Sequence, residues 1–355
     1  MATNMIERRS ATRYRFRAGL AVVAGLAGLA WAFVSWALPP RLVPAPVGVS
    51  FDRRDNALWL GRRWLHEEPS DAEVDALAAR LAAHGISTVY PFLGPMNARG
   101  WPGWRDRGVI RTFTHERARS FRERLRSRAA GVRVIPWTGG VLDEDVVFAD
   151  RARIDGFLEQ VRWLAGDGGF DGVHLNVEPL ADDDPAFLRF LGEVKAALPH
   201  GRLLSVAAYP PTTPLHPYKR VHWSVDYIRR VCDVADDLAV MSYDTALRWP
   251  RVYERLMASW TRDLAGLPFA APAGCEVRMG VPTYEDIAGW HDPATERVTT
   301  ALTGIRAGLA ALREPVAPGE AAIRGITIYA DWTTDEREWR EIDRQWSAGE
   351  PAGAR

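Results

Sequence analysis

The chain has 355 residues, of which 47% are hydrophobic and 25% are charged. These proportions are typical of a globular protein and exclude a largely disordered chain. The 45 Lys and Arg residues balance the 45 Asp and Glu residues, so the formal net charge is zero and no overall positive field favours nucleic acid.

The N-terminal segment has the pattern of a membrane anchor. Residues 18–38 contain no charged side chain, and an arginine cluster precedes them. About 20 apolar residues span a bilayer, and the arginine excess keeps the N-terminus in the cytoplasm. We predict a cytoplasmic stub over 1–17, a single transmembrane helix over 18–38, a Pro-rich linker over 39–50 and an extracytoplasmic remainder in the cell membrane. Cleavage near Ala37 as a signal peptide, which would secrete the domain, is the alternative.

The two cysteines, Cys232 and Cys275, have neither C-x-x-C nor zinc-site spacing. In an oxidising compartment they could pair. The sequence leaves open whether they form a disulfide or two buried thiols, because only the fold sets the distance between them.

From residue 51 onward, short β-rich runs alternate with amphipathic helical runs. This alternation is typical of a parallel sheet, and eight units over 51–348 fit the size of a closed (β/α)8 TIM barrel, an α/β fold. We predict that barrel as one domain, with a tail over 349–355. The sequence has no G-x-G-x-x-G after the first strand and no P-loop, so nothing favours an open nucleotide-binding sheet. The expected strands are 57–60, 86–93, 132–137, 172–178, 203–209, 238–244, 277–284 and 323–329.

Helix start signals occupy the gaps between the expected strands. Residues 70–73 and 333–336 both have the form of a capping box. Asp184 followed by Pro185 is typical of an N-cap and a first-turn proline. The aspartate run 182–184 is therefore interpreted as a solvated helix cap and not as a metal site.

The fourth expected strand carries a row of polar residues. Side chains alternate between the two faces of a strand, so His174, Asn176 and Glu178 share one face. The aliphatic residues between them must pack against the helices. The polar row therefore points into the barrel, with Glu178 at the carboxyl end, where barrel enzymes place their chemistry.

This strand, from Asp171 to Glu178, resembles the strand-four signature of glycoside hydrolase family 18, Asp-Gly-x-Asp-x-Asp-x-Glu. Other segments resemble the ends of the family's other strands in the same order, over about residues 130–335. They are Trp137-Thr138-Gly139-Gly140 for Ser-x-Gly-Gly, Met241-Ser242-Tyr243-Asp244 for Met-x-Tyr-Asp, Gly280-Val281-Pro282-Thr283-Tyr284 for Gly-x-Pro-x-Tyr, and Gly325-Ile326-Thr327-Ile328-Tyr329 for a segment that usually ends in Trp.

The resemblance implies a hydrolase or transglycosylase acting on N-acetylglucosamine-containing glycans such as chitin, peptidoglycan or N-glycans, with no cofactor or metal. In this family the 2-acetamido group of the sugar attacks its own anomeric carbon. By resemblance, Glu178 acts as general acid and then as general base. Asn176 holds the acetamide N–H, Tyr243 binds the acetamide oxygen with Asp244 nearby, and Tyr329 forms an aromatic floor.

Asn176 and His174 stand where the family has aspartates. The carbonyl of Asn176 can accept the acetamide N–H, but this side chain cannot ionise, so it neither stabilises a positive oxazolinium nor raises the pKa of Glu178 by repulsion. The related family 85 endo-β-N-acetylglucosaminidases use an Asn-x-Glu pair productively. For His174 we expect a neutral core imidazole bonded to Asn176; zinc is disfavoured because no second convergent His is visible.

Tryptophans follow several of the expected strands. Aromatic faces stack on the C–H faces of sugars, so this distribution favours a glycan cleft, although loop anchoring explains any single one equally well. They are Trp101 and Trp104 after the second strand, Trp137 at the end of the third, Trp249 after the sixth, Trp290 after the seventh and Trp332 after the eighth. We expect Trp137, Trp332, Tyr284 and His174 to contact substrate.

Two other functions stay open at this stage. A retaining glycosidase with two carboxylates could use Glu178 with Glu285, just past the seventh strand, although the spacing Asn176-Val177-Glu178 fits the Asn-Glu motif of such enzymes poorly. A non-catalytic, chitinase-like carbohydrate-binding protein is favoured by the loss of both aspartates and opposed by the retention of Glu178, Tyr243 and Asp244.

Overall fold

The computed structural model of the protein describes residues 25–32, 34–35, 38, 42–266, 274–312, 323–348 and 350–351. The predicted stub over 1–17 lies outside the described residues, as does about half of the predicted membrane span over 18–38. Among the described residues, no helix has both the length and the apolar character that a bilayer crossing requires. The membrane anchor therefore stays a prediction from the sequence.

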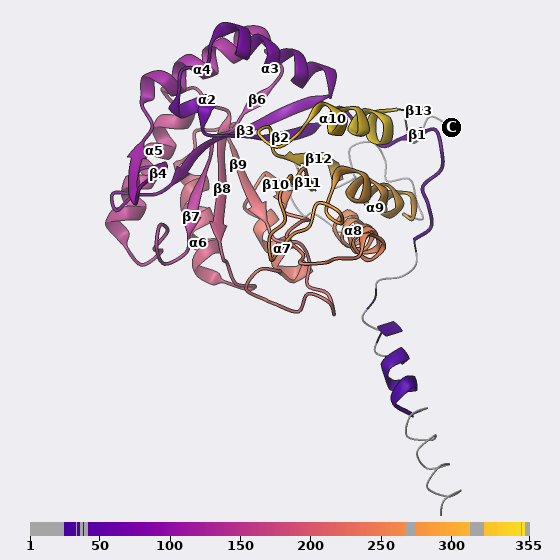
Figure 1. Cartoon of the computed structure of the whole chain (residues 1–355). Coiled ribbons are helices and arrows are strands. Elements are labelled where there is room, and N and C mark those ends of the chain that lie inside the picture. Colours follow the sequence, from indigo (N-terminus) through magenta and orange to yellow (C-terminus); the bar gives the residue numbers. More distant parts are fainter. Residues whose placement is uncertain are drawn as a thin grey trace, which may run out of the picture.

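In the described part of the chain, a parallel sheet closes on itself as a barrel (Figure 1). The strand order is β2-β12-β11-β10-β9-β8-β7-β3-β6, and a further pairing of β2 with β3 completes the ring. β6 and β7 both pair with β3 and share the third of eight positions. The barrel strands are β2 Asn56–Leu60, β3 Ile86–Pro95, β6 Arg133–Val134, β7 Trp137–Val141, β8 Gly172–Glu178, β9 Leu203–Ala208, β10 Asp237–Val240, β11 Glu276–Pro282 and β12 Ile323–Tyr329.

Helices surround the strands, as Figure 1 shows, so the strand residues that face the helices are buried. The helices are α2 Arg63–His66, α3 Asp71–Ala83, α4 His115–Arg128, α5 Arg151–Ala165, α6 Pro185–Ala197, α7 Val225–Cys232, α8 Pro250–Ala265, α9 Val298–Ala310 and α10 Glu336–Ile342, which continues into the π-helical η1 Asp343–Ser347. The predicted (β/α)8 barrel is confirmed. Two short pairings lie outside it: the hairpin of β4 Gly103–Asp106 with β5 Val109–Thr112, and β1 Val49–Ser50 with β13 Glu350–Pro351.

Two strands differ from their predicted bounds for local reasons. The third is split at Pro136, which has no N–H for the ladder and leaves a gap between β6 and β7. The sixth ends at Val240 instead of Asp244, because Ser242 N–H turns back to the Val240 carbonyl at 2.8 Å and Asp244 has a left-handed φ of 58°. The segment 241–244 therefore leaves the sheet at the barrel mouth.

The helix caps agree with the sequence at two sites and differ at a third. Ser70 and Glu73 form the predicted capping box of α3, and the Asp184 side chain caps α6 ahead of its first-turn proline. The box predicted over 333–336 is wrong. Asp335 and Glu338 cap α10 instead, because the Thr333 hydroxyl is already bonded to the Thr283 hydroxyl at 2.8 Å.

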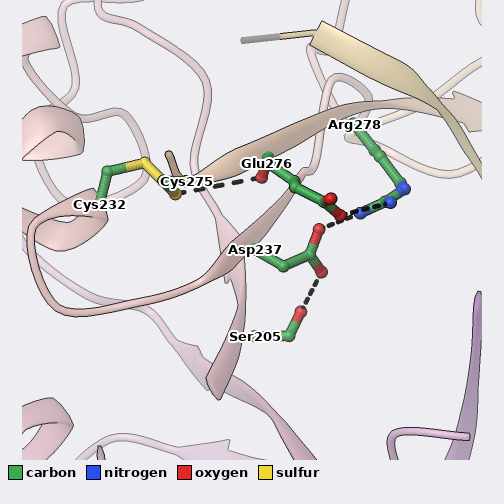
Figure 2. Close-up of a disulfide and its surroundings, with 6 residues drawn as sticks. All are labelled: Ser205, Cys232, Asp237, Cys275, Glu276 and Arg278. Atoms are coloured by element: carbon green, nitrogen blue, oxygen red, sulfur yellow. Dashed lines mark hydrogen bonds and ion pairs between the residues drawn. A yellow bond between two sulfur atoms is a disulfide. The ribbon is translucent and has the colours of Figure 1, made fainter. Parts of the chain in front are cut away.

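Cys232, at the end of α7, and Cys275, just before β11, form a disulfide (Figure 2). Their Cα atoms are 5.4 Å apart, which is normal for a bridged pair. Of the two possibilities that the sequence leaves open, the fold selects the disulfide. It closes a loop that contains β10 and α8.

Arg278 on β11 lies fully buried at the opposite end of the barrel from Glu178. Its guanidinium is 2.7 Å from Asp55. It is also 2.8 Å from Glu276 and pairs with Asp237 at the start of β10, as Figure 2 shows. The cation thus joins the ends of β10 and β11 to the residue just before β2.

Candidate active site

β8 places its side chains as the sequence predicts. Val173, Leu175 and Val177 are almost completely buried in the core under the helices. His174 is also fully buried but lies on the other face, in contact with side chains from other strands. The polar row therefore lies inside the barrel, with Glu178 at its open end.

His174 contacts different partners from those expected. Its Nδ1 is 2.7 Å from the Ser205 hydroxyl, its Nε2 is 3.3 Å from the Trp59 indole nitrogen, and its ring stacks on Tyr90 at 4.1 Å. The predicted bond to Asn176 is wrong, because both ring nitrogens already have partners, Ser205 on β9 and Trp59 on β2. Burial lowers the pKa of His174 to about 3, so the imidazole is neutral, and it lies beneath the site.

Glu178 accepts hydrogen bonds from two neighbours. The Tyr209 hydroxyl, just beyond β9, donates to Oε2 at 3.2 Å, and the Asn176 side-chain amide donates to the same carboxyl group. Burial raises the pKa of Glu178, these two donors lower it, and the Asp244 charge raises it; the net direction is upward. A carboxyl group with a raised pKa is suited to general acid catalysis.

The Asn176 carbonyl oxygen, Oδ1, is buried and has no hydrogen-bond partner in the described part of the chain. Buried polar atoms in proteins are almost always paired, so an unpaired acceptor of this kind needs an explanation. Because the amide nitrogen is used by Glu178, the free oxygen beside the acid is available to an N–H donor from a ligand.

Asp244 is held by groups from the loop after β11. The Tyr284 hydroxyl donates to it at 2.6 Å, and His291 Nδ1 lies 3.2 Å away with its ring stacked on Tyr284 at 3.7 Å. Burial raises the pKa of Asp244, although Tyr284 and His291 oppose the rise. Tyr284 was predicted from the sequence, whereas His291 was not.

Glu296 is a second carboxyl group that sequence reasoning missed. It is fully buried and accepts the backbone N–H of Asp244 at 2.7 Å, together with the backbone N–H and hydroxyl of Thr245 at 3.0 and 2.7 Å. Burial raises the pKa of Glu296 to about 7. Its position, just before α9, fixes the turn that presents Asp244.

Aromatic rings form the floor of the site. Tyr243 stacks on Tyr329 at 5.0 Å, Trp59 meets both rings edge-on at 6.3 and 5.5 Å, and Trp332 meets Tyr329 edge-on at 5.5 Å. Tyr329 therefore occupies the centre of the floor. Trp59 was not selected from the sequence, because only barrel closure brings β2 beside β12.

Two of the cavities at the carboxyl ends of the strands adjoin the aromatic floor. One, of about 360 Å³, is the Glu178 cavity, and the other, of about 440 Å³, is the Trp137 cavity. The Glu178 cavity is lined by Glu178, Tyr209, His222, Tyr243, Asp244 and Trp290. The Trp137 cavity is lined by Arg62, Arg63, Phe92, Trp137, Asp331 and Trp332.

The remaining predicted residues are distributed around this mouth. Trp249 and Trp101 are exposed, and neither lines the Glu178 cavity or the Trp137 cavity. Trp104 packs beneath the Arg62 guanidinium at 4.4 Å. Glu285 lines a separate cavity with residues of α9 and α10 and does not line the Glu178 cavity.

The aspartate run 182–184 is not simply a solvated cap. Asp184 caps α6 as expected, but the Asp182 side chain is 2% exposed and accepts the Ser224 backbone N–H and hydroxyl, both at 2.8 Å. It therefore ties the start of α7 to the loop after β8. In the described part of the chain, no group of His, Cys, Asp and Glu side chains is arranged to hold a metal ion.

The fold and the arrangement at the strand ends define a TIM barrel like those of glycoside hydrolase family 18. The chain superposes on the Bacillus cereus spore cortex-lytic enzyme SleL with a TM-score of 0.53 and 13% identity, over 85% of this chain and 76% of that one. It superposes on a GH18 chitinase from Pseudoalteromonas aurantia with a TM-score of 0.51 and 14% identity, over 82% and 98% of the two chains. A chitinase from Bacteroides thetaiotaomicron gives 0.51 and 12%, over 86% and 98%. No sequence-family model and no curated protein matches the chain.

Proposed function

We propose that the protein is a glycoside hydrolase or transglycosylase that cleaves N-acetylglucosamine-containing glycans by substrate-assisted catalysis. The observation that carries the proposal is the pair of Asn176 and Glu178. The Asn176 amide nitrogen donates to the acid, while its buried oxygen has no partner among the described residues. A 2-acetamido group supplies the N–H donor that this oxygen lacks.

In the first step, protonated Glu178 gives its proton to the glycosidic oxygen as the bond from that oxygen to the anomeric carbon breaks. The acetamide oxygen forms a bond to the anomeric carbon and the acetamide becomes an oxazolinium. Asn176 Oδ1 orients the acetamide N–H, and the Tyr243 hydroxyl lies on the same floor for its oxygen. In the second step, the Glu178 carboxylate takes a proton from the attacking water, the bond from anomeric carbon to acetamide oxygen breaks, and the acetamide re-forms.

Burial provides the acid's raised pKa in this arrangement. Glu178 has no neighbouring carboxylate at position 176 to repel its charge, yet its pKa is raised by desolvation, with a smaller contribution from Asp244. A neutral Asn176 leaves the oxazolinium without a close counter-charge from that position. We therefore expect slower formation of the intermediate than a carboxylate at this position would allow.

The test is reducing-end release from chitin oligosaccharides and from peptidoglycan by the full chain, beside Glu178→Gln. We expect turnover in the wild type and its loss in the variant, and competitive inhibition by a thiazoline that mimics the oxazoline. Turnover that survives in Glu178→Gln would refute the assignment. Glycan binding without turnover in either protein would favour the carbohydrate-binding alternative.

The two-carboxylate retaining mechanism is the less favoured of the two catalytic mechanisms. Glu285 is exposed and lines a different cavity from Glu178. A nucleophile must reach the anomeric carbon opposite the acid, which requires the two groups to share one site. Glu285→Gln should therefore leave turnover within about twofold of wild type.

We also infer that the barrel lies outside the cytoplasm, tethered by residues 18–38 or secreted after cleavage. The apolar segment behind an arginine cluster supports export, and the disulfide fits an oxidising compartment. A C-terminal alkaline phosphatase, active only after export, should be active in expressing cells. An inactive reporter would contradict export, and complete release of the chain by alkaline carbonate would contradict the anchor.

A further inference from the structure

The Trp137 cavity lies beside the Glu178 cavity on the same barrel mouth. The aromatic floor joins them, because Tyr243 lines the Glu178 cavity, Tyr329 stacks on Tyr243, and Trp332 on the far side of Tyr329 lines the Trp137 cavity. Phe92 and Trp137, with ring centroids 4.5 Å apart, supply an apolar wall. A sugar unit next to the one above Tyr329 would therefore enter a cavity with aromatic faces.

The charged side chains that line the Trp137 cavity differ in how many of their hydrogen-bonding groups already have partners within the protein. Asp331 accepts the Gly61 backbone N–H at 2.7 Å and the Trp64 indole N–H at 2.6 Å, and burial raises its pKa. Arg63 is paired with Glu73. Asp331 and Arg63 therefore already have partners within the protein and stabilise the cavity wall.

Arg62 is the cation that stays available. Within the part of the chain that the structure describes, its carboxylate partner is Glu67 at 3.6 Å, and both side chains are half-exposed. Its guanidinium lies 4.4 Å above the Trp104 ring, which fixes its position at the cavity without using its N–H donors. A planar guanidinium with free donors is a matched receptor for a carboxylate.

We propose that Arg62 makes the Trp137 cavity a subsite for a sugar that carries a carboxylate, adjacent to the N-acetylglucosamine unit at Glu178. The inference rests on the proposed function and narrows its substrate class from neutral glycans to acidic ones. The carboxylate can come from the lactyl ether of a muramic acid or from a uronic acid, and both present the same anion to Arg62.

The experiment compares pairs of glycans that differ only in charge. Peptide-free peptidoglycan strands and hyaluronan oligosaccharides are each assayed before and after reduction of their carboxyl groups to alcohols, with chitotetraose as a neutral reference. The proteins are the full-length wild type, Arg62→Gln and Arg80→Gln. Arg80 is a matched control, because it also pairs with a carboxylate and lies over a tryptophan ring but does not line the cavity.

We expect wild type to prefer at least one acidic glycan over its reduced form. Arg62→Gln should lower kcat/KM on that acidic glycan by roughly three- to tenfold, chiefly through KM, and leave the reduced form and chitotetraose within about twofold. The preference should also weaken as salt is raised, because the pair is exposed. The glycan affected identifies the source of the carboxylate.

An equal effect of Arg62→Gln on both members of each pair, or no charge preference in wild type, would overturn this inference while leaving the proposed function intact. Failure of wild type to cleave any of these glycans would instead overturn the proposed function. In that case titration calorimetry with the same glycan pairs decides the inference: a wild-type preference for the acidic member that Arg62→Gln abolishes supports it, and equal affinities refute it.

Discussion

Burial and hydrogen bonding shift the pKa of Glu178 in opposite directions. Desolvation raises its pKa, whereas the Asn176 amide and the Tyr209 hydroxyl stabilise the carboxylate and lower it. The chain thus combines a buried acid with neutral neighbours at positions 176 and 209. Each neighbour can be removed separately, which makes the balance testable.

Tyr209→Phe should move the alkaline limb of the pH profile of kcat/KM to higher pH. The leaving-group oxygen needs protonated Glu178, so activity falls as pH rises through the pKa of this group. Removing the 3.2 Å hydrogen bond destabilises the carboxylate and raises that pKa further. The exposed Tyr218→Phe is the matched control and should leave the limb in place. A limb that moves to lower pH in Tyr209→Phe would contradict the argument.

Asn176→Ala should lower kcat on acetamido sugars by about a hundredfold, because the acetamide loses the acceptor that orients it. The thiazoline inhibitor should bind correspondingly less well. Asn176→Asp keeps an acceptor and adds a charge beside Glu178, so it should stay active and move the alkaline limb upward. Wild-type turnover and inhibition in Asn176→Ala would show that this oxygen has no part in the reaction.

At the scale of elements, the loop after β11 holds the turn after β10. Asp244 adopts a left-handed φ of 58°, a conformation that costs a non-glycine residue energy and persists only where surrounding contacts offset that cost. Glu296 enforces it by accepting the backbone N–H groups of Asp244 and Thr245. The position of one functional carboxyl group therefore depends on another, fully buried one.

Glu296→Gln should lower kcat/KM by between about ten- and a hundredfold, because one acceptor oxygen becomes a donor facing an N–H and Asp244 shifts. It should also change the dependence of stability on pH. The pKa of Glu296 is about 7 in the folded protein against an ordinary value of 4.5. Its contribution is therefore fully present below pH 4.5 and is lost, by roughly 3 kcal/mol, as pH rises through 7.

Urea unfolding at pH 5 and pH 8 measures this effect. The fall in unfolding free energy between the two values should be smaller in Glu296→Gln than in wild type. The pKa of Glu338 is also raised to about 7, but this group is present in both proteins, so the difference between them isolates Glu296. Equal falls in the two proteins would refute the assignment of a buried, neutral Glu296 at low pH.

The sequence predicted the strand-borne part of the site because a strand has a period of two. That period was enough to place His174, Asn176 and Glu178 on the inner face and to put Glu178 at the mouth. It could not place His291 or Glu296, which come from an irregular loop without a repeating pattern. Tyr209 could have been selected from the sequence, since it ends an expected strand at the catalytic edge of the barrel. Of the hydrogen-bond partners of His174, Ser205 lies in register on the neighbouring strand β9, whereas Trp59 comes from β2 across the barrel and is revealed only by barrel closure.

At the scale of the whole molecule, the two ends of the barrel differ in the side chains that they bury. The mouth is aromatic and holds the site, whereas the opposite end holds the fully buried Arg278 among three carboxylates. Burial alone would raise the pKa of Asp55, but Arg278, with Ser87 and Arg133, lowers it to about 2. The ion cluster therefore stabilises the fold where β2, β10 and β11 begin.

Arg278→Met should lower the unfolding free energy at pH 7 by roughly 3–5 kcal/mol, because it leaves Asp55, Asp237 and Glu276 without their shared buried cation. In wild type the lowered pKa of Asp55 gives stability that is present above its ordinary value of 3.8 and lost as pH falls through 2. The variant loses the main cause of that lowering, so its carboxylates take up protons more readily on folding. The deficit in unfolding free energy relative to wild type should therefore narrow as pH falls from 7 to 5.

Urea unfolding at both pH values checks this, with Arg80→Met as an exposed control expected to lose less than about 1 kcal/mol. A deficit that does not change with pH would mean that the loss comes from packing around Arg278 and not from its charge.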